Sequence, residues 1–119
     1  MGITTVKLTI KNPFKLSKKI TENFLVDTGA HYTVLPLSMV KKLGLRPSFK
    51  QEFSFADGKI ISRNVSSAII TFEGKELAAP VVLGEKEDDA ILGVTTLESF
   101  GLMIDPFNRK IYHSKLMLA

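Results

Sequence analysis

The residues best suited to chemistry are an aspartate, a threonine and a glycine directly after an apolar run, in the segment LVDTGA at residues 25–30. An ionised carboxylate at the end of a buried strand is costly unless it has partners, or its pKa shifts. Asp27 could serve there as a general acid or base. Thr28 adds a hydroxyl beside it, and Gly29 lets the backbone turn sharply. The alternative is that Asp27 only caps a turn, but its apolar approach favours a functional role.

A second apolar run that ends in glycine, AILG at residues 90–93, lies far downstream and precedes a short helix expected over residues 96–100. Between the two motifs, Asp57-Gly58 separates extended segments at 48–55 and 59–63. Asp-Gly in this setting predicts a β-hairpin with a type I′ turn, in which both central residues have positive φ. The chain therefore carries two glycine-containing motifs with a hairpin between them.

The other elements predict a mainly-β domain that is closed or sandwich-like, with two short helices. Ser38 is the expected N-cap of a helix that ends before Gly44. Turns are expected at 11–19 and 73–75. The length of 119 residues allows one domain, residues 1–119. Strands are expected at residues 3–10, 20–26, 32–35, 79–83, 102–105 and 111–112.

Composition excludes several classes of protein. The chain has no cysteine, so it has no disulfide framework, thiolate zinc site or cysteine nucleophile, and we expect a cytoplasmic location. With two histidines a polyhistidine metal site is not expected, nor is any metal or cofactor. No segment predicts a membrane span or a signal peptide. The formal net charge is +4, but the basic residues are scattered along the sequence, which disfavours a nucleic-acid partner.

Together, DTGA, ILG and the hairpin between them resemble the retropepsin-like aspartic proteases, the single-domain relatives of pepsin found in retroviruses and in cellular proteins. The resemblance implies a closed, mostly antiparallel, barrel-like β fold with one or two short helices. Asp27 would face a cleft, and Thr28 would form a hydrogen-bonded clasp between two subunits. The hairpin Phe53–Arg63 would be a flap, and residues 90–93 would thread behind the active loop, with Gly93 permitting close passage of the backbone.

The resemblance also implies the site residues. The catalytic set is Asp27, Thr28 and Gly29. The set expected to bind substrate is Ala30, Ala56, Asp57, Gly58, Lys59, Asp89 and Ile91. We further expect Asp89, with Asp88 as a second candidate, to favour a basic side chain in the substrate.

Amide hydrolysis by bound water needs one carboxylate that accepts a proton and another that donates one. Two carboxylates about 3 Å apart share a proton and titrate as a unit. The chain has one DTG segment, so we expect the second carboxylate to be Asp27 of another copy across a two-fold axis. Asp105 is an in-chain alternative, although an Asp before a proline more often opens a turn.

The sequence thus predicts a homodimeric aspartic endopeptidase that cleaves extended peptides. The alternatives are a non-catalytic peptide-binding or dimerisation module of the same fold and, less favoured, a small basic β-barrel that binds nucleic acid. Three segments keep open roles. The acidic residues 85–89 form a solvated loop or bind a divalent cation. His31 tunes the catalytic pair or is structural. The apolar tail at 114–119 forms dimer contacts or packs on its own subunit.

Overall fold

The computed structural model describes residues 4–105 and 107–118, which form nine strands and two short helices. The prediction of a mainly-β domain with two short helices is confirmed. The strands are β1 (Thr5–Asn12), β2 (Lys15–Val26), β3 (Thr33–Leu35), β4 (Phe49–Ser54), β5 (Ile60–Phe72), β6 (Lys75–Leu83), β7 (Ile91–Leu92), β8 (Leu102–Asp105) and β9 (Lys110–His113), and the helices are α1 (Leu37–Leu43) and α2 (Val94–Ser99).

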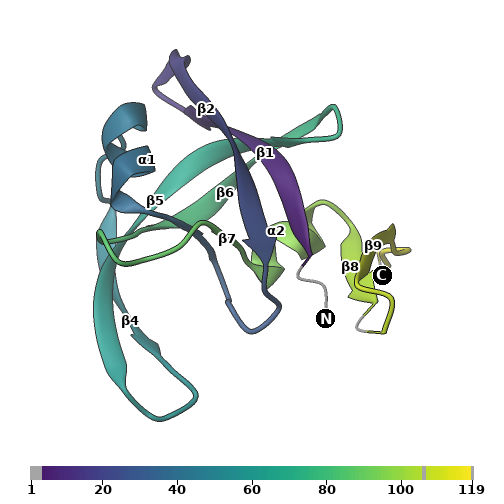
Figure 1. Cartoon of the computed structure of the whole chain (residues 1–119). Coiled ribbons are helices and arrows are strands. Elements are labelled where there is room, and N and C mark those ends of the chain that lie inside the picture. The colour runs from purple at the N-terminus through teal and green to yellow at the C-terminus, as the bar shows by residue number, and fades with distance from the viewer. Residues whose placement is uncertain (1–3, 106, 119) are drawn as a thin grey trace.

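Seven of the strands form one sheet in the order β1-β2-β7-β3-β6-β5-β4, and β1 also pairs with β5. The sheet therefore curls into a ring with β4 on its edge, whereas β8 and β9 form a separate hairpin beside it (Figure 1). The ring is barrel-like, as expected, although it is not a true barrel. Two pairings, β2 with β7 and β3 with β6, are parallel.

The core fills the inside of this ring. Alternate residues of β1, Leu8 and Ile10, point inward as the period-two pattern requires, and Phe24 of β2 is fully buried beside them. The remaining buried apolar residues of this cluster are Val26, Leu35, Leu43, Leu45, Ala68, Ile70, Ala79, Val81, Leu83, Leu92, Leu97 and Leu102. No helix among the described residues is long and apolar enough to cross a membrane.

The short strand β7 positions the loop that follows β2. It lies between β2 and β3, where Leu25 pairs with Ile91 and Val26 with Leu92 in parallel, and Val34 pairs with Ile91 in antiparallel. The prediction that residues 90–93 thread behind the loop at Asp27 is confirmed by these pairings. One strand, which comes much later in the sequence, thus supports both ends of that loop.

The turn predicted at residues 11–19 is much shorter than expected. β1 continues to Asn12 and β2 begins at Lys15, so only two residues form the turn. Residues 15–19 are all exposed, because this end of the β1–β2 hairpin projects from the ring (Figure 1). Because these five residues are all exposed, this part of the strand needs no alternation of apolar and polar residues, and its sequence shows none.

The two hairpin turns differ in geometry, and the turn at Asp57-Gly58 differs from the prediction. At the tip of the β4–β5 hairpin only Gly58 has positive φ, at 87°, so the type I′ turn predicted for Asp57-Gly58 is wrong. Gly58 N–H donates to the Phe55 carbonyl at 2.9 Å, which gives a three-residue loop closed by a left-handed glycine. Positive φ at two consecutive positions occurs instead at Glu73 (49°) and Gly74 (81°), between β5 and β6.

Helix α1 begins two residues earlier than Ser38 would require as its N-cap. Pro36 occupies that position in extended backbone, and no side chain caps the helix. Proline suits the start of a helix because the first N–H groups have no partner within the helix. The end is as predicted, since Gly44 is left-handed (φ 67°) and its N–H bonds back to the carbonyls of Val40 and Lys41.

Candidate active site

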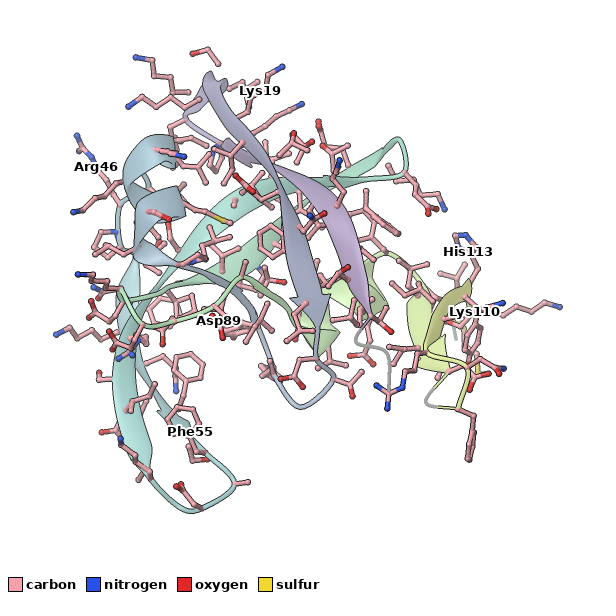
Figure 2. All side chains as sticks on the ribbon, in the orientation of Figure 1. Lys19, Arg46, Phe55, Asp89, Lys110 and His113 are labelled. Carbon is pink, nitrogen blue, oxygen red and sulfur yellow. The ribbon has the colours of Figure 1, made fainter. Side chains whose placement is uncertain are left out.

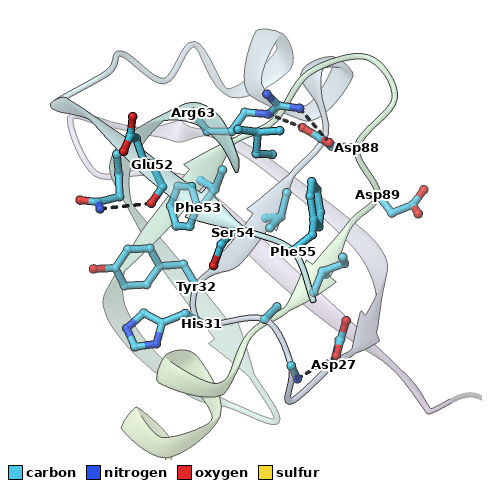
Figure 3. A pocket seen from close by; sticks show the side chains of 17 residues that line it. Asp27, His31, Tyr32, Glu52, Phe53, Ser54, Phe55, Arg63, Asp88 and Asp89 are labelled. Atoms are coloured by element: carbon cyan, nitrogen blue, oxygen red, sulfur yellow. Dashed lines mark hydrogen bonds and ion pairs between the residues drawn. The ribbon is translucent and has the colours of Figure 1, made fainter. Parts of the chain in front are cut away.

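A cleft of about 600 Å³ lies between the loop after β2 and the β4–β5 hairpin (Figure 3). Its walls combine carboxylates and one arginine with aromatic and aliphatic side chains. The lining residues are Asp27, Gly29, Ala30, His31, Tyr32, Val34, Gln51, Glu52, Phe53, Ser54, Phe55, Ile61, Arg63, Val82, Asp88, Asp89 and Ile91.

Asp27 lies exposed in the loop between β2 and β3, with its carboxylate at one end of the cleft. Gly29 N–H donates to Asp27 Oδ1 at 2.8 Å, and the Asp27 backbone N–H donates to the Leu92 carbonyl at 3.2 Å. A Cβ at Gly29 would lie 3.1 Å from Asp27 Oδ1, so glycine leaves the carboxylate room to bond this backbone. The loop thus fixes the position of the carboxylate and leaves it open to solvent.

The backbone behind this loop comes unusually close to it. A Cβ at Gly93 would lie 2.4 Å from the carbonyl carbon and oxygen of Tyr32, which real side chains do not tolerate. The predicted close passage at Gly93 is therefore confirmed. Immediately afterwards, Val94 N–H donates to the Ala30 carbonyl at 2.9 Å, and Thr95 N–H donates to the His31 carbonyl at 3.0 Å. Helix α2 is thereby attached to the loop through the loop's own carbonyl groups.

A buried pair of threonine hydroxyls lies next to the close backbone passage at Gly93. Thr33 Oγ1 and Thr96 Oγ1 are 2.7 Å apart, and Gly93 N–H donates to Thr33 Oγ1 at 3.1 Å. Both threonines are fully buried. The sequence analysis did not predict this pair. The signal that could have found it is a threonine beside apolar residues in each of the two segments. Because a buried hydroxyl needs a partner, the pair fixes β3 and α2 relative to each other.

The hairpin side of the cleft is aromatic. Phe53 and Phe55, at the end of β4, line the cleft, and the Phe53 ring meets Tyr32 edge-on with centroids 6.2 Å apart. The His31 ring lies against Tyr32 with its plane tilted by 54° and the centroids 4.8 Å apart, and it is exposed at the rim. These aromatic residues were not predicted, since no motif distinguished them from core residues.

The residues predicted to bind substrate are only partly brought together. Ala30, Asp89 and Ile91 line the cleft, whereas Ala56, Asp57, Gly58 and Lys59 form the exposed hairpin tip and do not line it. The side chain of Thr28 is exposed and has no hydrogen bond within the described part of the chain.

A two-pronged ion pair closes the other end of the cleft (Figure 3). Arg63 of β5 donates through Nε to Asp88 Oδ2 at 2.8 Å and through a terminal nitrogen to Asp88 Oδ1 at 3.2 Å. Glu85 N–H also donates to Asp88 Oδ2, at 2.7 Å. The hydrogen bonds from Arg63 hold the pKa of Asp88 below its ordinary value against the opposing effect of burial. The same contact holds the pKa of Arg63 above its ordinary value.

This ion pair bears on the alternatives for residues 85–89. The charge of Asp88 is compensated by its ion pair with Arg63, while Asp89 is exposed at the rim and makes no ion pair with any other described residue. Among the described residues, no group of three or more histidine, cysteine, aspartate or glutamate side chains is placed to hold a metal ion. Of the two acids expected to attract a basic substrate side chain, Asp89 alone is free to do so.

Asp105, the in-chain alternative to a second Asp27, lies outside the cleft. Its Oδ1 accepts from Phe107 N–H at 2.9 Å and from Asn108 N–H at 3.2 Å. These two hydrogen bonds lower the pKa of Asp105, and the bond from Phe107 N–H has the larger effect. Asp105 therefore organises a turn, as its turn chemistry predicts. The tail reaches back to β8, where Ser114 N–H donates to the Gly101 carbonyl at 2.8 Å, but residues 116–118 are exposed.

Comparisons with known proteins agree with this geometry. Residues 14–99 match the model of a family described as gag-polyprotein putative aspartyl protease. No curated protein matches the chain. The chain is similar to many solved structures, including one titled EIAV protease complexed with the inhibitor HBY-793. The two are 19% identical, with a TM-score of 0.65, over 98% of this chain and 94% of that one. The predicted retropepsin-like fold is thereby confirmed.

Proposed function

Because this chain belongs to the gag-polyprotein putative aspartyl protease family, we propose that it is an aspartic endopeptidase whose catalytic pair is Asp27 from each of two copies. The observation that carries the proposal is the state of Asp27 itself. Its carboxylate is held by Gly29 N–H at a cleft, and the backbone around it is fixed by β7, yet it remains exposed. Only a second carboxylate is missing for acid–base hydrolysis.

In the proposed reaction the two Asp27 carboxylates share one proton and hold a water between them. The ionised carboxylate takes a proton from the water as its oxygen attacks the scissile carbonyl carbon, and the protonated one donates to the carbonyl oxygen. The resulting tetrahedral diol collapses with proton transfer to the leaving nitrogen. No acyl-enzyme forms, and no metal or organic cofactor takes part.

The lining of the cleft supports an extended peptide as the substrate. Phe53, Phe55 and Ile91 offer apolar surface, and Asp89 provides an uncompensated negative charge at the rim. We propose that the β4–β5 hairpin is the flap, and that residues 56–59 at its tip reach the peptide only after the hairpin closes. Thr28, whose hydroxyl has no partner within the described chain, would find one across the dimer axis.

The proposal is tested with the wild type, Asp27→Asn and a matched control, Asp105→Asn, which removes the same charge outside the cleft. A peptide library is digested across acid to neutral pH with each protein. We expect cleavage by the wild type and the control, and none by Asp27→Asn, which keeps its fold by circular dichroism. Undiminished cleavage by Asp27→Asn would refute the assignment.

A mixing experiment tests whether two copies form the site. Inactive Asp27→Asn replaces wild type in increasing proportion at constant total protein concentration, under conditions in which subunits exchange. If each site needs both carboxylates, activity falls as the square of the wild-type fraction. A linear fall would show that one chain suffices. A wild type that dimerises and binds peptides without cleaving them would favour the non-catalytic module.

A further inference from the structure

The charge of this chain is distributed unevenly. Residues 1–51 contain nine lysines and arginines and only two acidic residues, whereas residues 52–119 contain seven basic and ten acidic residues. No acidic residue occurs between Asp27 and Glu52. The net charge of +4 therefore conceals a strongly basic first part and a mildly acidic second part.

The fold gathers part of this basic surface around a groove. The groove has a volume of about 610 Å³ and lies where the turn of the β1–β2 hairpin meets the chain that follows α1. Its lining residues are Asn12, Pro13, Phe14, Lys15, Lys18, Gly44, Leu45, Arg46, Pro47, Ser48, Ser66 and Ser67, and they include no acid. It shares no residue with the cleft at Asp27. In Figure 2, Lys19 and Arg46 project from this end of the molecule and Phe55 lies at the other.

The cations of this groove have no counter-charge within the described chain. Lys15, Lys18 and Arg46 make no ion pair there, in contrast to Lys11, which pairs with Glu76 at 2.7 Å. Lys18 Nζ lies over Gly44 at the end of α1, where the helix carbonyls favour a cation, but those partial charges do not neutralise an ammonium. Lys41 and Lys42 extend the same charge along the last turn of α1.

The groove also has an aromatic wall. Phe14 is 97% exposed and stands at the hairpin turn, between the cations. Its position is fixed from below, because Phe14 N–H donates to Asn12 Oδ1 at 2.8 Å and the Asn12 amide donates to the Leu43 carbonyl at 2.9 Å. A fully exposed phenylalanine on an ordered turn offers a free face for stacking.

We propose that this groove binds single-stranded nucleic acid. Lys15, Lys18 and Arg46 would contact successive phosphates, and a base would stack on Phe14, since cationic grooves with exposed aromatics bind single strands in this way. Basic residues separated in the sequence thus lie together in the fold, which reverses the reasoning that scattered lysines disfavour such a partner. A concave site lined by serine hydroxyls suits a phosphate chain better than a flat anionic membrane. The inference does not depend on proteolysis.

The first test is the salt dependence of binding to a fluorescent oligothymidylate of about a dozen nucleotides. Each phosphate contact with a single strand contributes a slope of about −0.7 to log K against log salt, so three contacts give about −2. Raising salt from about 50 to about 200 mM should then weaken binding about 15-fold. The full chain is used, and anisotropy gives the affinity.

The second test compares two triple variants of equal net charge. Lys15→Gln/Lys18→Gln/Arg46→Gln removes the groove cations. Lys75→Gln/Lys110→Gln/Lys115→Gln removes three exposed cations outside the groove. We expect the groove variant to lose nearly all binding and its salt slope, and the control to keep both. Phe14→Ala should weaken binding about tenfold without changing the slope, and it keeps the proposal testable if the groove variant misfolds.

Three results would overturn the proposal. They are no binding at about 50 mM salt, equal losses in the two triple variants, or binding to phosphatidylserine vesicles with none to the oligonucleotide. The last result would assign the groove to a membrane surface instead.

Discussion

Replacing Asp88 with Asn should destabilise the protein at neutral pH and leave it almost unaffected in acid. Asp88 accepts hydrogen bonds of 2.8 and 3.2 Å from Arg63 and one of 2.7 Å from Glu85 N–H. The substitution keeps the shape of the side chain but removes its charge. It therefore weakens the link between β5 and the 84–90 connection without opening a cavity.

The size of the effect follows from the burial of the pair. The side chains of Arg63 and Asp88 are 13% and 21% exposed. Exposed ion pairs contribute at most about 1 kcal/mol, and breaking a fully buried pair costs about 3–5 kcal/mol. Asparagine still accepts a hydrogen bond, so we expect a loss of about 1–2 kcal/mol in the free energy of unfolding at neutral pH.

The sign of the pH dependence follows from the lowered pKa of Asp88. Its pKa lies below the ordinary value of 3.8 in the folded protein, mainly because of the Arg63 hydrogen bonds. The unfolded chain therefore takes up the proton first as the pH falls. The stabilisation by ionised Asp88 is complete at pH values above the ordinary pKa of an aspartate. It is lost as the pH falls through the pKa of Asp88 in the folded protein, so the stabilities of the wild type and Asp88→Asn converge there.

Urea unfolding of the wild type, Asp88→Asn, Arg63→Gln and the double variant measures this coupling at neutral pH and near pH 3. The control is Glu87→Gln, because Glu87 approaches Arg63 only at 3.5 Å and is largely exposed, so its loss should be within about 0.5 kcal/mol. Additive effects of Asp88→Asn and Arg63→Gln at neutral pH would refute this account, as would a difference that does not shrink as the pH falls below the ordinary pKa of 3.8.

Two further substitutions test the support of the active loop. Gly93→Ala places a Cβ 2.4 Å from the Tyr32 carbonyl and should lower the free energy of unfolding by about 3 kcal/mol or more. The control Gly74→Ala, at φ 81° in open space, should lower it by about 1–2 kcal/mol. Equal losses in urea unfolding would contradict the close contact at Gly93. Thr33→Val leaves the Thr96 hydroxyl and Gly93 N–H without their partner and should lower the free energy of unfolding by about 1–3 kcal/mol. Thr33→Ser keeps the hydroxyl and should retain most of that stability. An unchanged stability of Thr33→Val would show that the hydroxyl pair contributes nothing.

The sequence was sufficient where a local pattern has one structural solution. An apolar run that ends in Asp27 and a second that ends in Gly93 required a fixed loop and a close backbone passage, and both are present. The alternation in β1 predicted its inward face. The order of the elements, together with the DTGA and ILG motifs, was enough to predict the fold.

Other features depend on contacts across the fold and left no local signal. Asp57 has negative φ because the hairpin closes through a three-residue loop, which the Asp-Gly pair alone does not distinguish from a type I′ turn. The pairing of Arg63 with Asp88 joins segments that no motif connects. Lys18 and Arg46 share a groove only because the β1–β2 hairpin folds over the end of α1.

The placement of β7 also dictates when the loop at Asp27 can form. Leu25 and Val26 receive their parallel partners from Ile91 and Leu92, so the chain must be synthesised past Leu92 before the loop is supported. Pairings between such distant segments form late, because a long stretch of chain must close first. During translation, a ribosome-bound fragment that ends before Ile91 holds Asp27 in an unsupported loop, and the native arrangement there forms only after Ile91 and Leu92 have left the ribosome.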